Sequence, residues 1–270
     1  MTAMSTLNDV LTDLRAESED LDHRVAALPT EAWKIETPAP GWTIAHQIAH
    51  LAWTDEVALL STVDPERFIA VLSDAAADPG GFVEATTQAG AEQSPGELLV
   101  RWRAGRAALA VALAEVPDGT RLPWFGTQMT ATSMVTGRLM ETWAHGQDVA
   151  DALGVTREPT ARLKHIARLA VRTRDWAFGV RGMTPPADEF RVELGAPDGL
   201  DVWTWGPADA TNRVAGPALD FCLLATQRRH RGDLAIVATG EDAAVWLDIA
   251  QAFAGPPGQG RTQGQFSALS

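Results

Sequence analysis

Two short stretches of the sequence combine histidine with carboxylate side chains at helical spacing. The stretch "HQIAH" carries His46 and His50, and "ETWAHGQD" carries Glu141, His145 and Asp148. Residues three and four positions apart share one face of an α-helix. Two imidazoles and one carboxylate from facing helices can hold a divalent cation and leave a fourth position open for water or substrate. The spacing therefore permits an open metal site of the catalytic kind.

Each stretch also has a simpler interpretation. A glutamate and a histidine four residues apart are most often a surface pair or a helix-capping pair. The two histidines of "HQIAH" lack the glutamate that follows the first histidine in metalloprotease helices. The tryptophans near these stretches are by default core residues, and the single cysteine, Cys222, is by default a buried, unreactive thiol.

The elements that must position these residues are predicted to be helices. Apolar residues recur at helical spacing in four long segments, which are residues 5–28, 44–63, 94–116 and 130–154. Thr43 is a plausible N-cap of the second segment, and Gly154 ends the fourth. Residues 64–91 are weakly patterned, and residues 120–129 are predicted to form a loop rich in aromatic side chains. The pattern predicts an antiparallel four-helix bundle over residues 1–156.

The second half of the chain has a mixed pattern. After a helix at about 160–179, residues 190–197 and 200–205 alternate as strands do, around a turn at 197–199. A helix at 216–227, a strand at 234–240 and a helix at 242–253 follow. We therefore predict an α+β chain, with a small α+β domain over residues 157–256 and a disordered tail at 257–270, which is rich in Gly, Pro and Gln.

Composition excludes several classes of function. The formal net charge of −13 argues against a nucleic-acid partner, because phosphate binding needs a basic surface. No run approaches the roughly 18 apolar residues of a membrane span, and the N-terminus lacks a signal-peptide pattern. One cysteine excludes an internal disulfide and a cysteine-rich zinc site. These features predict a cytoplasmic protein without a membrane partner, and they leave its oligomeric state open.

The two histidine-containing stretches together resemble a known family. "GWTIAHQIAHL" is similar to the second-helix motif of the DinB-like metal-binding bundles, and "ETWAHGQDVADAL" is similar to their last-helix motif. The nearest branch is typified by mycothiol-dependent maleylpyruvate isomerase. In that branch a helical bundle precedes a small sterol-carrier-like α+β domain. The resemblance covers roughly residues 5 to 255, and the motifs follow in the same order.

The resemblance implies a site and its ligands. The metal ligands would be His50, Glu141 and His145, with Asp148 supporting a ligand or helping to bind a thiol cofactor. His46 is left out of the ligand set, as a supporting or exposed residue. Zinc is favoured by two histidines and one glutamate, although nickel fits similar ligands. Arg228 and Arg231, in the basic run at 228–231, are candidates to hold a substrate carboxylate; the alternative is that these arginines offset the dipole of a helix C-terminus.

The function that the resemblance implies is metal-dependent chemistry on a small molecule. A low-molecular-weight thiol such as mycothiol would attack a carbon electrophile, in an S-transferase or a cis-trans isomerase. Aromatic residues expected near the site suggest a substrate with an apolar part, although they could simply pack the bundle; they are Trp42, Trp53, Trp124, Phe125 and Trp143. Two alternatives stay open: a thiol-independent metal-dependent lyase, hydrolase or cyclase, and a metal- and ligand-binding protein without catalysis.

Overall fold

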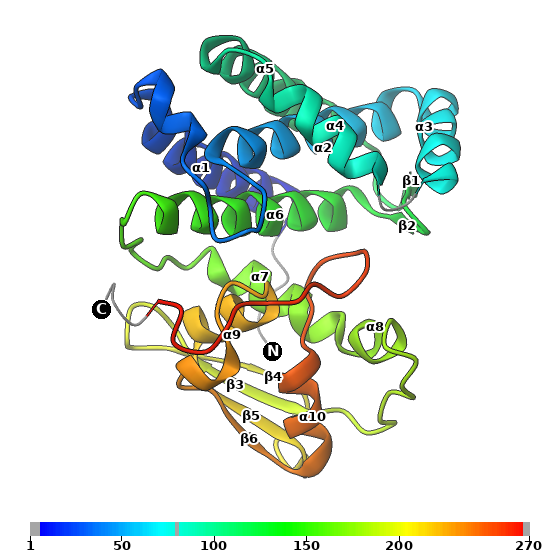
Figure 1. The fold of residues 1–270 in the computed structure, drawn as a ribbon. Coiled ribbons are helices and arrows are strands. Elements are labelled where there is room, and N and C mark those ends of the chain that lie inside the picture. The colour runs from blue at the N-terminus through cyan, green and yellow to red at the C-terminus, as the bar shows by residue number, and fades with distance from the viewer. Residues whose placement is uncertain (1–5, 79–80, 267–270) are drawn as a thin grey trace. The chain divides into compact units, whose positions relative to one another are not determined.

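The computed structural model describes residues 6–78 and 81–266. The chain divides into two compact units, Met1–Thr156 and Arg157–Ser270. The first unit is mainly helical, and the second combines helices with a four-stranded sheet. This confirms the predicted α+β class (Figure 1). Within the described residues, every helix is too short or too polar to span a bilayer.

The first unit is built on long helices at the positions that the periodicity predicts. Helix α2 packs against α5 and α6, and α1 packs against α6 (Figure 1). Shorter elements lie in the connections between them, including residues 64–91, which are weakly patterned in the sequence, and residues 120–129, which are predicted to be a loop. The elements of this unit are α1 (Leu7–Ala26), a 3-10 helix (Thr30–Lys34), α2 (Ile44–Val63), α3 (Pro65–Ala77), α4 (Gly81–Ala91), α5 (Pro95–Ala114), the hairpin β1 (Leu122–Trp124) and β2 (Thr127–Met129), and α6 (Ala131–Ala152).

Polar contacts between the long helices fix their directions. Arg103 and Arg106 of α5 bind Asp22 of α1, and Arg106 also donates to the Ser18 carbonyl, one turn earlier in α1. The later residue of α5 reaches the earlier residue of α1, so α1 and α5 run antiparallel. The apolar stripes meet in a core that includes Ile48 and Trp102, both fully buried. Burial of this core supplies most of the stability of such a bundle.

The second unit contains a sheet in the strand order β4-β3-β5-β6, in which β3 and β5 are parallel and the other pairs are antiparallel. Helix α9 packs against α7 and against the two central strands. The elements of this unit are α7 (Leu163–Arg172), α8 (Arg174–Gly179), β3 (Arg191–Gly195), β4 (Val202–Trp205), β5 (Arg213–Pro217), α9 (Ala218–Ala225), a 3-10 helix (Arg231–Asp233), β6 (Val237–Thr239) and α10 (Glu241–Ile249).

Two details of the second unit differ from the sequence prediction. The central strand β5 was not predicted, because in Arg213–Pro217 only Val214 is a strong strand former and Gly and Pro end the run. The helix expected at about 160–179 is two helices, divided at Thr173. The Thr173 hydroxyl lies 2.9 Å from the Gln251 carbonyl oxygen, a tertiary contact that no local pattern contains.

The C-terminal segment contains turns but no helix or strand over residues 251–266. The Gly264 amide donates to the Asp233 carboxylate, and the Arg229 guanidinium lies 3.6 Å from the centre of the Phe266 ring. Part of the predicted disordered tail, residues 267–270, lies outside the described residues. The disorder of residues 257–270 stays a prediction.

Candidate metal centre

Helix α2 begins where its capping residues place it. Thr43 is the N-cap, and its backbone N–H donates to Nδ1 of His46, three residues later, at 3.2 Å. The other ring nitrogen of His46 lies 2.8 Å from Oε1 of Gln88 on α4. Both nitrogens of His46 are therefore used in capping and in helix packing. This explains why His46, despite its spacing from His50, is not part of the metal-ligand group.

Helix α6 presents Glu141 and His145 from its central turns. The helix starts at the N-cap Thr130, whose hydroxyl accepts from the Ser133 amide, and it ends before Gly154 with a φ of 65°. A positive φ at this position is the usual glycine signal for ending a helix. Because the two residues are four apart, they extend from the same face toward α2.

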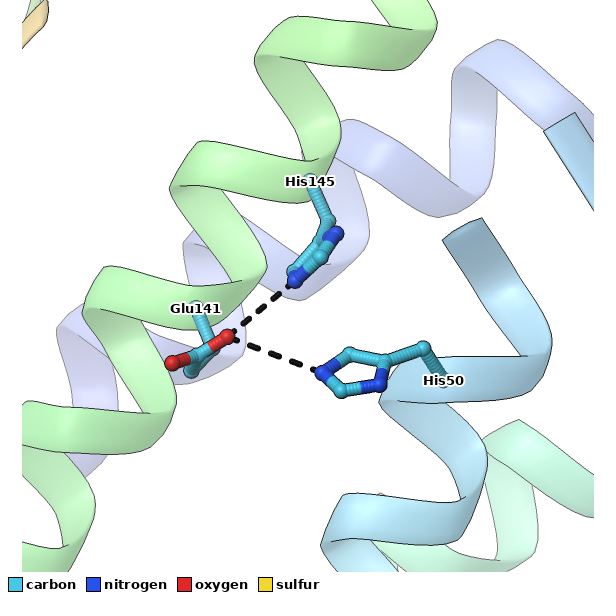
Figure 2. A group of neighbouring side chains, drawn as sticks. All are labelled: His50, Glu141 and His145. Atoms are coloured by element: carbon cyan, nitrogen blue, oxygen red, sulfur yellow. Dashed lines mark hydrogen bonds and ion pairs between the residues drawn. The ribbon is translucent and has the colours of Figure 1, made fainter. Parts of the chain in front are cut away.

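The structure brings three of the predicted site residues together. His50, Glu141 and His145 each offer a ligand atom, and these atoms all lie within 4.8 Å of one another. Oε2 of Glu141 lies 3.1 Å from Nε2 of His145 and 3.8 Å from Nε2 of His50. Figure 2 shows the carboxylate of Glu141 facing both imidazoles, with His50 approaching from the facing helix.

The arrangement fits a divalent cation. Zinc bonds of about 2.0–2.1 Å with tetrahedral angles place ligand atoms about 3.3 Å apart. The two separations from Oε2 of Glu141, 3.1 Å and 3.8 Å, bracket this value, and all three ligand atoms lie within 4.8 Å of one another. The side chains of His50, Glu141 and His145 are 13%, 24% and 11% exposed, so the cluster is largely shielded but keeps some access to solvent. Three candidate ligands with some solvent access suit a site that binds a further molecule.

The electrostatics of the cluster favour an ionised carboxylate. Burial alone would raise the pKa of Glu141, but hydrogen bonds and positive charge from His145 and His50 hold this pKa well below its usual range. An ionised carboxylate is the form that binds a metal. The chemistry of the three side chains therefore matches their geometry.

A glutamine that the sequence prediction missed contacts one of the candidate ligands. Gln47 of α2 is fully buried, and its Oε1 lies 2.5 Å from Nδ1 of His145. Its amide nitrogen donates to the Thr37 hydroxyl at 2.8 Å. In the sequence, Gln47 is only the residue between two more conspicuous positions of "HQIAH". The sequence held one signal for this role. Gln47 lies three residues before His50, so both residues lie on the face of α2 that is directed toward α6.

Aromatic rings line the histidines. The Trp42 ring centre lies 5.3 Å from that of His50 and 5.9 Å from that of His145, and the Trp53 ring centre lies 5.9 Å from that of His50. The Trp42 indole N–H donates to Glu84 of α4. These rings lower the local dielectric and strengthen electrostatic interactions at the cluster.

The other aromatic residues expected near the site have different places. Trp124 stacks on Phe68 of α3, and Phe125 contacts both rings edge to face. Trp143 is buried on α6. Trp42 and Trp53 are therefore the tryptophans that the ring geometry places against the site histidines.

The remaining predicted site residues lie outside the three-ligand group. Asp148 is fully buried on α6, three residues after His145. In the second unit, the Arg228 guanidinium donates to the Thr226 carbonyl, and Arg231 pairs with Asp248 at 2.5 Å and donates to the Ala244 carbonyl. The roles of Asp148, Arg228 and Arg231 stay predictions.

Cys222, the protein's single cysteine, is fully buried in α9, where burial raises the pKa of its thiol. Because the thiolate is the reactive form, we expect the native protein to resist an aromatic disulfide reagent. The same protein in denaturant should release one equivalent of chromophore. Rapid labelling of the native protein would contradict this expectation and would make Cys222 a possible nucleophile.

The chain is similar in sequence to proteins of uncharacterised function and similar in fold to an enzyme of known structure. Two uncharacterized proteins, from two strains of Mycobacterium tuberculosis, are each 59% identical over 249 residues, which is 92% of this chain and 96% of each relative. The crystal structure of the mycothiol-dependent maleylpyruvate isomerase matches with a TM-score of 0.58 at 18% identity, over 87% of this chain and 93% of that chain. A mutant of that enzyme matches equally well. At this identity, the two solved structures show the shared fold.

Two family models match parts of the chain. One, described as wyosine base formation, covers only residues 186–239, the region from β3 to β6. The other, described as the mycothiol maleylpyruvate isomerase N-terminal domain, covers residues 14–150, which hold all three residues of the cluster. The chain therefore belongs to the family of the mycothiol maleylpyruvate isomerase N-terminal domain.

Proposed function

We propose that this protein is a metal-dependent enzyme that uses a low-molecular-weight thiol, such as mycothiol, as the nucleophile on a carbon electrophile. The observation that carries the proposal is the convergence of His50, Glu141 and His145 inside the part of the chain that matches the family. Zinc is the metal we propose, because two imidazoles and a carboxylate suit it, and nickel is the alternative.

The protein's own residues would divide the work as follows. His50, Glu141 and His145 would hold the metal, and a bound divalent cation would supply positive charge that lowers the pKa of a nearby thiol. Trp42 and Trp53 would exclude water from the side of the site where they contact the histidines. Because Cys222 is buried, we propose that a small thiol and not this cysteine is the nucleophile.

The reaction that follows is either isomerisation or transfer. The thiol gives up its proton, and its sulfur forms a bond to carbon while the π electrons of the electrophile move to a conjugated carbonyl. In an isomerase, the carbon–carbon bond rotates, the sulfur–carbon bond breaks and the thiol regains a proton. In a transferase, the carbanion takes up a proton or expels a leaving group, and the thioether is the product.

The substrate would be a small molecule with an apolar part, which suits the aromatic rings at the site. Arg228 and Arg231 are the residues that we propose for holding a substrate carboxylate, since a guanidinium binds a carboxylate through two parallel hydrogen bonds. We propose that Asp148 helps to bind the thiol cofactor.

The test is to incubate the zinc-loaded protein with mycothiol and either maleylpyruvate or a panel of thiol-reactive electrophiles. We expect either isomerised maleylpyruvate with no loss of thiol, or thiol loss that matches thioether formation. His50→Ala should lose the activity, and His23→Ala, which changes an exposed histidine of α1, should keep it. A protein that binds zinc at the cluster but accelerates neither reaction would contradict the thiol chemistry and favour the thiol-independent or non-catalytic alternatives.

A further inference from the structure

The two imidazoles of the cluster differ in how they are held. Nδ1 of His145 contacts the buried Gln47 side chain at 2.5 Å. Nδ1 of His50 is also buried, but it has no hydrogen-bond partner among the described residues. The contact with Gln47 therefore distinguishes the histidine on α6 from the histidine on α2.

The hydrogen bonds around Gln47 determine which way its amide points. The Thr37 hydroxyl lies 2.7 Å from the Trp42 carbonyl oxygen, and a carbonyl can only accept, so the hydroxyl proton must point to it. The same hydroxyl oxygen, 2.8 Å from Gln47, must then accept from the amide nitrogen. This leaves the amide oxygen of Gln47 facing His145. The orientation of the Gln47 amide therefore follows from the single hydroxyl proton of Thr37. It does not depend on how the amide oxygen and nitrogen were assigned.

The direction of the amide in turn assigns the ring nitrogens of His145. An amide oxygen has no hydrogen to give, so Nδ1 must carry a proton and donate it to Gln47. The proton-free position for a metal is then Nε2, which is the nitrogen that faces Glu141 at 3.1 Å. In the metal-free protein Nε2 can donate a hydrogen bond to this carboxylate. A divalent cation would replace that proton and bind both the nitrogen and the oxygen.

We infer that Gln47 and Thr37 form a relay that fixes the tautomer of His145 so that its Nε2 is presented to the metal, which makes Gln47 a positioning residue of the site. This inference rests on the proposed metal site. The relay runs from the Trp42 carbonyl through Thr37 and Gln47 to His145. Outer partners of this kind contribute about 10–100-fold to metal affinity or activity.

The first test reads the proton directly and needs no metal. In the metal-free protein labelled with nitrogen-15 histidine, His145 should show a solvent-protected proton on Nδ1. Thr37→Ser, which keeps the hydroxyl, should leave this signal unchanged. Gln47→Met, which keeps the size of the side chain but removes the acceptor, should abolish it. A wild-type His145 without a proton on Nδ1 would overturn the inference, whatever the protein's affinity for zinc.

The second test measures zinc affinity by competition with a chelating dye, alongside the thermal stability of the metal-free protein. Gln47→Met should bind zinc about 10–100-fold more weakly than wild type. Gln47→Glu can only accept at this position, so it should retain at least wild-type affinity even though a buried carboxylate lowers the stability of the metal-free protein. Thr37→Val removes the hydroxyl that fixes the orientation of the Gln47 amide. Its zinc affinity should lie between those of Gln47→Met and Gln47→Glu.

The outcomes separate the relay from the site itself. Equal zinc affinity in wild type and Gln47→Met would contradict the inference and leave the proposed metal site intact. Loss of affinity in Gln47→Glu equal to that in Gln47→Met would indicate a packing role only. If wild type binds no zinc at all, the proposed metal dependence fails, and the proton on Nδ1 still decides the inference.

Discussion

Replacing Glu141 by glutamine should abolish high-affinity metal binding, with at least a 100-fold rise in the dissociation constant for zinc. The change keeps the shape of the side chain but removes the only negative charge among the three candidate ligands. Loss of an outer partner alone costs about 10–100-fold, and loss of a ligand should cost more. Competition with a chelating dye measures the constant. Activity toward any thiol acceptor should be lost with the metal.

Stability gives a second readout of the same substitution. A ligand present at 100 times its dissociation constant stabilises the folded state by about 2.7 kcal/mol. Zinc should therefore raise the unfolding temperature of the wild-type protein, and a chelator should reverse the effect. In Glu141→Gln the zinc-dependent rise should be absent. Glu66→Gln, at an exposed position of α3, is the matched control and should behave as wild type. A variant of Glu141 that still gains stability from zinc would show that the metal binds elsewhere.

The long helices could be predicted because their signals are local. Thr43 caps α2 and Gly154 follows α6, both as the sequence indicates, and α5 starts at Ser94 and Pro95 within the segment predicted at 94–116. Apolar periodicity then favours packing of these helices against one another, since each has an apolar stripe to bury. His50, Glu141 and His145 were chosen as candidate ligands by their spacing together with the resemblance to a family, and the structure brings them together. Spacing alone would not have distinguished them from surface pairs.

The features that could not be predicted depend on contacts between distant residues. Gln47 gains its role only when α2 faces α6, because its partner lies 98 positions later in the chain. His46 has the same residue type and helix as His50, but its ring nitrogens are taken up by Thr43 and Gln88. The strand β5 forms because β3 and β6 supply its hydrogen-bond partners on both sides. Tertiary pairing outweighs local propensity in each case.

The second large effect is expected at a buried ion pair that joins the two helices with the candidate ligands. Arg138 of α6 donates from Nε to Asp55 of α2 at 2.8 Å, and the two residues are 2% and 4% exposed. Burial raises the pKa of Asp55, and the Arg138 guanidinium opposes this shift. Arg138→Met should destabilise the protein by about 3–5 kcal/mol, because it leaves a buried carboxylate without its partner. Urea denaturation followed by helical circular dichroism measures the change.

Two further variants separate this effect from a general loss of charge. Lys34→Ala removes an exposed partner of Glu31, with side chains 71% and 81% exposed, and should cost at most about 1 kcal/mol. The double variant Asp55→Leu with Arg138→Met removes both charges and should recover much of the loss, since apolar replacements of a buried pair are often neutral. If the double variant were as unstable as Arg138→Met, packing and not the unpaired charge would explain the result.

The ion pair should also affect the metal centre, because of where it lies along the helices. Gln47 pairs with His145, His50 with Glu141, and Asp55 with Arg138, so residue numbers rise on α2 as they fall on α6. The three contacts are successive ties between the same two antiparallel helices, and the residues of the cluster belong to the first two. Releasing the tie at Asp55 should let the helices shift and weaken zinc binding in Arg138→Met. Zinc affinity that recovers in the double variant would indicate that helix spacing, and not the charge of Arg138, sets the geometry of the ligands.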